Sequence, residues 1–288
     1  MRTHRPRRNV GHVSFYNLES MKPIPLFVHE GADISGDDFT RALKDLGVRD
    51  RDVAFVHADI GAFGKLAVLD RNILCRHIVD SLMEAAPGMT LTMPTFTYAF
   101  CKDGIFDPDE SPSEVGVLTE FFRHEKGVVR SPHPIFSIAA EGPRTEEMTR
   151  VGTDSFGENS FFAHLHNANG IIIFFGASFE RATFAHYIEQ MHGVPYRFLK
   201  TFTGIVRAHG VEEKVSSTYL VRPLDQDVET NLIRLENALR AQNVLKEVRV
   251  GNGAILAVRA KDMFSIGSRM LDENIYAFLK NPPKSYTG

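Results

Sequence analysis

Short apolar runs alternate with longer amphipathic stretches along most of the chain, beginning near residue 34. Ser35 followed by Asp38 is similar to a capping box, with aspartate in place of the usual glutamate, and predicts the start of a helix. Apolar residues then recur at helical spacing up to Gly47, at Phe39, Ala42, Leu43 and Leu46. The pattern therefore predicts a first amphipathic helix that ends at Gly47.

The same periodicity predicts further helices separated by short buried strands. Strands are expected at residues 53–56, 89–93, 137–140 and 170–176, and antiparallel strands within 198–221. Helices are expected at 73–85, 115–124, 183–192, 227–242 and 262–279. A hairpin is expected at 248–258, a polar loop at 101–114 and a turn at 156–160.

Alternating helices and strands are typical of a layered α/β fold. We expect a single three-layer α/β/α domain whose mixed, largely parallel central sheet has antiparallel additions in the C-terminal half. No repeat or linker divides residues 21–288. Residues 1–20 are expected to form a flexible basic extension, because Arg2, Arg5, Arg7 and Arg8 crowd one short stretch without an apolar segment after them.

Composition narrows the functional class. The 288 residues carry 33 Lys and Arg against 36 Asp and Glu, a net charge of −3, so a dedicated nucleic-acid binder is not expected. Two cysteines exclude a disulfide framework and a cysteine zinc cage. The longest apolar runs, such as 171–177, are far too short to span a membrane. We therefore expect a cytoplasmic enzyme or binding protein.

The first candidate site is the turn after the first predicted strand. His57 ends that strand, and Ala58, Asp59, Ile60 and Gly61 follow it. Ligands of open α/β sheets bind outside the carboxyl ends of strands. The turn offers backbone N–H groups to a phosphate, but it is too short for a P-loop, so an ordinary strand-to-helix turn remains open.

A second candidate lies at Arg130 and Ser131, beside His133. Pro132 and Pro134 restrict the backbone there and so orient the neighbouring side chains. Arginine binds phosphate through two parallel hydrogen bonds. The alternative for this segment is a rigid surface loop.

The third candidate is the pair His186 and Glu189. Residues three apart lie on one face of a helix. A carboxylate next to an imidazole fixes its tautomer and raises its basicity, as a general base requires. The same spacing also occurs in ordinary surface pairs, so the pattern alone leaves both interpretations open.

Taken in order, six segments resemble the aminoglycoside 3-N-acetyltransferase family, the coenzyme A-dependent antibiotic acetyltransferases. They are residues 56–60, 88–98, 113–116, 130–137, 156–160 and 183–189. The resemblance implies that residues 21–288 form an acetyltransferase domain that uses acetyl-CoA as co-substrate and needs no metal.

The resemblance also implies roles. His186 would be the general base for the acceptor amine, and Glu189 would orient it or touch the acceptor. Acetyl-CoA would be held by His57, Ala58, Asp59, Ile60 and Gly61, with Arg130 and Ser131. The usual family turn has serine where this chain has Ala58-Asp59, which weakens that inference. The acceptor would meet Tyr98, Asp103, Asp107, Glu189 and Arg197.

Two kinds of acceptor remain open. Segments such as 56–66 and 194–200 look closer to family members associated with polysaccharide biosynthesis, which favours an amino sugar, free or nucleotide-linked. A polycationic aminoglycoside favours a strongly acidic enzyme. The balance of −3 becomes −7 without the four arginines of the extension, so an aminoglycoside stays open.

Two other classes remain as alternatives. One is a metal-dependent amide hydrolase that uses His57, Asp59, His133 and His186. The other is a catalytically silent interaction module. In each case we expect a small-molecule or protein partner rather than nucleic acid or membrane. A homodimer remains open.

Overall fold

The computed structural model describes residues 23–208, 210–224 and 228–282. The basic extension predicted for residues 1–20 lies outside the described residues. In the described ranges, the protein has no helix with both the length and the apolar character needed to cross a membrane.

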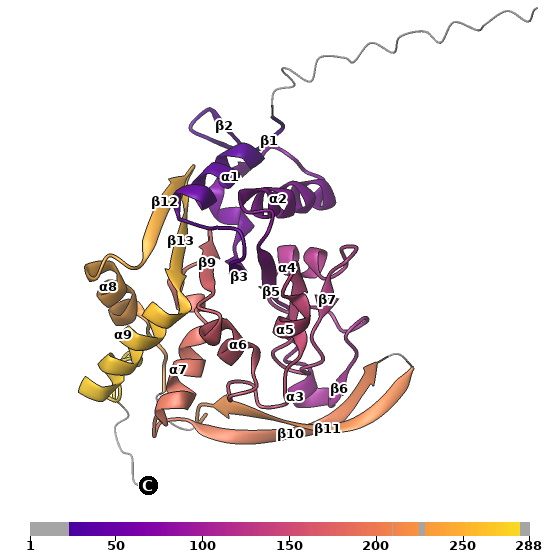
Figure 1. Ribbon diagram of the computed structural model, residues 1–288, viewed down its shortest axis with the longest axis vertical. Coiled ribbons are helices and arrows are strands. Elements are labelled where there is room, and N and C mark those ends of the chain that lie inside the picture. Colours follow the sequence, from indigo (N-terminus) through magenta and orange to yellow (C-terminus); the bar gives the residue numbers. More distant parts are fainter. Residues whose placement is uncertain (1–22, 209, 225–227, 283–288) are drawn as a thin grey trace, which may run out of the picture.

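A seven-stranded sheet forms the centre of the domain (Figure 1). Its order is β12 (Lys246–Val250), β13 (Gly253–Arg259), β9 (Ile171–Phe175), β3 (Val53–Ala58), β5 (Thr90–Pro94), β8 (Ile138–Glu141) and β7 (Val129–Arg130). β3 is parallel to both neighbours, β9 and β5, whereas the outer pairings are antiparallel. The parallel part is thus smaller than predicted, because β7 with β8 and β12 with β13 are antiparallel neighbours joined by short loops.

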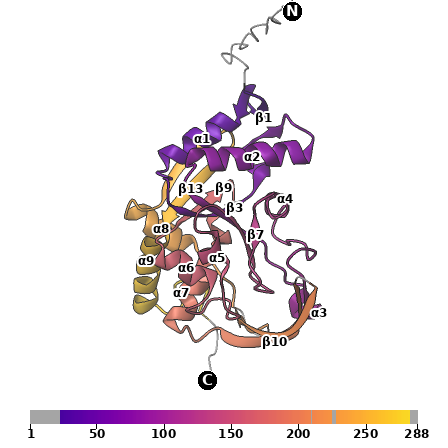
Figure 2. The ribbon, with the colours of Figure 1, turned by 45° about the vertical axis from the view of Figure 1, so that its right-hand side comes forward.

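Successive side chains of the central strands point to opposite faces, and each face has its own apolar core. Ala54 and Val56 join one cluster, whereas Val53 and Phe55 join the other. Helices α1 (Gly36–Asp45), α2 (Arg71–Ala85) and α4 (Val117–Phe122) cover the first face. The second face is covered by α5 (Thr145–Thr149), α6 (Phe161–Asn167), α7 (Phe184–His192), α8 (Ile233–Ala241) and α9 (Ala260–Glu273). Figure 2 shows the two helical layers, and the three-layer prediction is confirmed.

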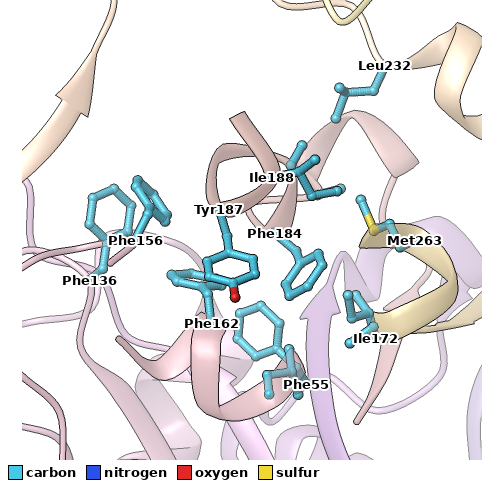
Figure 3. Packing of buried hydrophobic residues seen from close by; sticks show 14 of the residues in the cluster. Phe55, Phe136, Phe156, Phe162, Ile172, Phe184, Tyr187, Ile188, Leu232 and Met263 are labelled. Carbon is cyan, nitrogen blue, oxygen red and sulfur yellow. The ribbon is translucent and has the colours of Figure 1, made fainter. Parts of the chain in front are cut away.

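The core beneath α7 is rich in aromatic rings (Figure 3). Phe55 of the central strand meets Phe161 and Phe162 of α6 edge to face, with ring centroids 4.9 and 5.9 Å apart. On α7, Phe184 and Ile188 are fully buried. Helix α7 therefore packs into this core beside α6 and α9, which gives the side chains on it a rigid base.

Helix boundaries follow the predictions closely at the start of the chain and less closely at its end. The capping box of α1 is present, with the Ser35 N–H donating to Asp38 Oδ2 at 2.9 Å. Helix α8 begins at Ile233 rather than 227, and α9 ends at Glu273 rather than 279. Thr230 and Leu279 pair in an isolated bridge instead, which holds both flanking segments out of a helix.

Other elements surround the sheet. The predicted antiparallel strands form the long hairpin β10 (Phe198–Ala208) and β11 (Val211–Val221). The predicted polar loop contains α3 (Phe100–Asp103) and β6 (Ile105–Phe106), which pairs with β10. A small sheet that was not predicted comprises β1 (Pro25–His29), β2 (Ala32–Ser35) and β4 (Lys65–Leu66). The short 3₁₀ helices η1 (Ile60–Phe63) and η2 (Phe179–Arg181) follow β3 and β9.

Gly176 lets the chain leave β9 beside the turn that follows β3. Its φ is +71°, in the left-handed region that favours glycine. A Cβ there would overlap the carbonyl oxygen of Asp59 and lie 3.0 Å from the Ala62 Cβ. Close approach of these two turns therefore requires a glycine.

We predict that Gly176→Ala lowers the free energy of unfolding by about 2–5 kcal/mol, from the left-handed φ and from overpacking. Gly193→Ala is the matched control, because Gly193 has a φ of +75° with no atom within 4 Å of the new Cβ. It should lose only about 1–2 kcal/mol. Urea unfolding measures both, and equal losses would show that the close approach carries no cost.

Candidate active site

A cavity of about 770 Å³ opens at the carboxyl ends of the three parallel strands. The ends of β3 and β5 and the segments after β3, β5 and β9 supply most of its wall, and residues 114–118 at the start of α4, α7 and the segment before α8 supply the rest. The polar residues of the lining are His57, Asp59, Tyr98, Glu114, Ser178, Glu180, Arg181, Thr183, His186 and Thr230. The cavity therefore lies at the edge of the sheet where the sequence predicted ligand binding.

The predicted turn after β3 forms one side of the cavity. His57, Ala58, Asp59 and Ile60 line it. Gly61 does not, because its N–H turns back and donates to Asp59 Oδ1 at 3.2 Å. This bond caps η1 and gives the turn a defined shape.

His57 is 6% exposed and lies between two aromatic rings. Phe55 meets it edge-on at 4.7 Å, and Phe174 stacks with it at 5.5 Å between ring centroids. Burial lowers the pKa of His57 to about 3, so its ring is uncharged near neutral pH. Within the described residues, its buried Nε2 has no hydrogen-bond partner.

His186 and Glu189 form the closest polar contact at the cavity. Their spacing places both on one face of α7, and Nδ1 of His186 lies 2.6 Å from Oε2 of Glu189. The imidazole lines the cavity with its side chain 24% exposed, whereas Glu189 is fully buried. A carboxylate next to Nδ1 favours the tautomer with a proton there, which leaves the Nε2 lone pair free to accept a proton.

Glu189 has two further partners. The Tyr196 hydroxyl donates to Oε1 at 3.0 Å, and Arg197 Nε lies 2.8 Å from Oε2. That N–H direction misses the oxygen, so the Arg197 contact is an ion pair rather than a directed hydrogen bond. Burial alone would raise the pKa of Glu189, but His186 and Arg197 hold it below its usual value. The carboxylate is therefore charged behind the imidazole.

Comparison with known proteins identifies the family. The family profile described as aminoglycoside 3-N-acetyltransferase matches residues 55–272, most of the chain. This chain belongs to the aminoglycoside 3-N-acetyltransferase family. It is accordingly an acetyl-CoA-dependent N-acyltransferase, as the resemblance implied.

Individual relatives agree with this family. Aminoglycoside N(3)-acetyltransferase IV of Salmonella sp is 28% identical over 246 residues, covering 83% of this chain and 88% of the relative. Aminoglycoside N(3)-acetyltransferase IX of Micromonospora chalcea is 25% identical and covers 66% and 74%.

Two solved structures show the same fold. The binary complex of AAC-IIIb with CoASH has a TM-score of 0.73 at 21% identity, covering 87% of this chain and 99% of that one. Sisomicin-bound AAC-VIa has a TM-score of 0.72 at 24% identity, covering 84% and 99%.

Within the acetyltransferase, Arg130 and Ser131 do not line the cavity. All five N–H donors of the Arg130 guanidinium are used inside the protein. Their acceptors are the Thr95, Pro108 and Ser111 carbonyls and the Thr97 and Ser137 hydroxyls. Ser131 is fully buried and accepts from the Ile138 N–H at 3.0 Å. Both predicted coenzyme contacts therefore have a structural role instead. They hold the loops after β5 against the start of β8.

Only some of the residues predicted to contact the acceptor line the cavity. Tyr98 lines the cavity, but Asp103 and Asp107 do not. Asp107 borders a smaller depression of about 310 Å³ near the tip of the β10–β11 hairpin. Arg197 is 8% exposed and lies behind the cavity wall, donating to Thr230 Oγ1 at 2.8 Å. Because Glu189 is fully buried, it contacts His186 rather than an acceptor.

Several lining residues were missed by the sequence analysis. Glu180 and Arg181 follow β9 closely, as Asp59 follows β3, so their position after a predicted central strand is the signal that could have found them. Thr230 lies far along the chain from all of these and is brought to the cavity only by tertiary packing.

Three residues of the metal-hydrolase hypothesis, His57, Asp59 and His186, line the same cavity, whereas His133 does not. In the described ranges, no three His, Cys, Asp or Glu side chains are grouped as metal ligands. His133 is buried, and its Nδ1 accepts the N–H groups of Ile135 and Phe136 at 3.2 and 2.9 Å. The His133 ring therefore stabilises the loop before β8, and it does not line the cavity.

The uncharged state of His57 predicts a pH dependence of stability. Its pKa is about 3 in the fold and about 6.5 when unfolded, so only the unfolded chain takes up the proton between these values. The free energy of unfolding should therefore decrease as the pH falls from 6.5, by up to about 1.4 kcal/mol per pH unit. His133, whose pKa burial lowers to about 4, adds a similar effect.

His57→Leu should remove one of these two contributions. Urea unfolding between pH 7 and 4.5 should then give a shallower loss of stability in the variant than in the wild type. Identical slopes would mean that His57 is not held uncharged in the fold.

Proposed function

We propose that this enzyme transfers the acetyl group of acetyl-CoA to a primary amine of an amino sugar or aminoglycoside. The observation that carries the proposal is the His186–Glu189 pair, whose imidazole faces the cavity at the sheet edge. Both substrates would be bound together, with the acetyl-CoA thioester near the turn from His57 to Gly61. No covalent enzyme intermediate is required.

The proposed chemistry needs a neutral amine. An alkylammonium resembles lysine, whose pKa is about 10.4, so it is mostly protonated near pH 7. The neutral fraction of the amine would attack the thioester carbonyl, and Nε2 of His186 would accept a proton from its nitrogen. The tetrahedral intermediate then collapses to an amide and expels the coenzyme A thiolate, which takes up that proton from the imidazolium. Glu189 would stabilise the imidazolium formed in the first step.

The cavity wall has the charges to bind an amino sugar. Asp59, Glu114 and Glu180 place three carboxylates there, and each accepts a backbone N–H, from Gly61, Ala99 and Leu232 respectively. These groups suit an acceptor with ammonium groups. Relatives in this family have been solved with sisomicin, a gentamicin and apramycin.

Arg181 favours an acceptor that also carries an anion. Its side chain is exposed at the cavity wall, and it forms no ion pair with any residue of the described ranges. A nucleotide-linked amino sugar has both an amine and phosphates, so it can use both kinds of charge. We therefore propose this acceptor class alongside the aminoglycosides.

The role of His186 is tested by thiol release from acetyl-CoA, with a panel of aminoglycosides, free amino sugars and nucleotide-linked amino sugars. His186→Ala should lower kcat/KM by about 10²–10⁴. It should keep the rise in Tm caused by acetyl-CoA. His192→Ala on the same helix, outside the cavity lining, is the matched control and should keep its activity. Full turnover by His186→Ala would exclude the general base.

The acceptor class is tested with Arg181→Gln. Loss of a charge-assisted hydrogen bond should raise KM about tenfold or more for phosphate-bearing amino sugars, and leave KM for aminoglycosides unchanged or lower. Arg150→Gln, at an exposed ion pair on the surface, is the control. A rise in KM for acetyl-CoA instead would assign Arg181 to the coenzyme phosphates.

A further inference from the structure

The buried carboxylate of Glu189, behind His186, has three partners. One of these contacts, to His186, would be enough to orient the imidazole. Oε2 of Glu189 meets both His186 Nδ1 at 2.6 Å and Arg197 Nε at 2.8 Å, while Tyr196 holds Oε1. Two cationic or potentially cationic groups thus compete for one oxygen. We propose that Arg197 is a positioning residue that, through Glu189, keeps the imidazole of His186 uncharged. This proposal rests on the proposed role of His186 as the base.

Arg197 sets the net charge of the buried group formed by Glu189, His186 and Arg197. Glu189 is fully buried and Arg197 nearly so, whereas ordinary water screening reaches only part of the His186 ring. With Arg197 present, a neutral imidazole gives this group a net charge of zero, and an imidazolium gives +1. Without Arg197 the same two states carry −1 and zero. Because buried net charge is costly, the arginine favours the neutral imidazole, and its loss favours the imidazolium.

The geometry keeps this arrangement in place. Arg197 donates from Nη2 to Thr230 Oγ1 at 2.8 Å, so its guanidinium is held by a second contact besides the carboxylate. The Tyr196 hydroxyl is fully buried and fixes the carboxylate plane, which presents Oε2 to both His186 and Arg197. A free carboxylate could rotate to separate the two partners, and this one cannot do so without losing the tyrosine bond.

Other charged or titratable groups share the cavity with His186. On the remaining walls these are His57, Asp59, Tyr98, Glu114, Glu180 and Arg181. Asp154 approaches α7 through Gln190, which donates to both of its carboxylate oxygens at 3.0 Å. All of these groups are the same in each variant below, so a difference between variants reports on Arg197.

The test compares pH profiles of kcat/KM between pH 5.5 and 9.5, with the best acceptor from the panel. In Arg197→Met the acid limb should move at least one unit to higher pH. Activity at pH 7 should then fall severalfold and recover at higher pH. Arg197→Lys keeps the positive charge and should keep the wild-type limb. Tyr196→Phe keeps both charges and should lower kcat without moving the limb.

A second measurement needs no turnover. The midpoint of His186 titration, followed by NMR of the ring Cε1–H resonance in the free enzyme, should rise in Arg197→Met and stay in place in Arg197→Lys. Arg197→Gln replaces Arg197→Met if the latter does not fold, as judged by its melting transition. The same midpoint in all variants, or a uniform loss of rate that high pH does not restore, would overturn the proposal. Failure of the base assignment itself is distinct, since it appears as full activity of His186→Ala.

Discussion

The site depends on one arrangement of the sheet, the parallel pairing of β3 with both β9 and β5. Parallel strands bring their carboxyl ends to one edge, and the chain must leave each strand there by a separate turn. The three exits diverge to reach helices in different layers, which leaves a hollow between them. The cavity, the proposed base and the charged residues Asp59, Glu180 and Arg181 all follow from this edge, because each lies just after a parallel strand or on α7, which follows the exit from β9.

A second constraint is the burial of Glu189 beneath that hollow. An unpaired buried carboxylate is too costly to persist, so the surrounding chain has to supply partners. Here three come from α7 and the segment after it, at His186, Tyr196 and Arg197. The requirement that stabilises the fold is therefore the same one that defines the proposed base, since the imidazole is one of the groups that satisfies the carboxylate.

Local patterns were sufficient for much of the fold. The capping box at Ser35, the buried run of β9 and the Asn-Gly turn before β13 each predicted an element that the structure contains. Strand direction could not be predicted in the same way, because β8 is placed antiparallel to β5 by tertiary pairing. The ends of α8 and α9 depend on the bridge between Thr230 and Leu279, two residues far apart in the sequence.

The two arginines predicted to bind ligands show why side-chain chemistry alone was misleading about placement. A guanidinium binds a ligand only if its donors are left free, and this depends on what the fold packs around it. Arg130 is surrounded by carbonyl oxygens and uses every donor, and Arg197 is paired with the buried carboxylate of Glu189. Arg181 belongs to none of the motifs found in the sequence, yet it follows a central strand and lines the cavity. In this protein, the distance from the end of a parallel strand is therefore a better guide to which arginine lines the cavity than proximity to prolines or histidines.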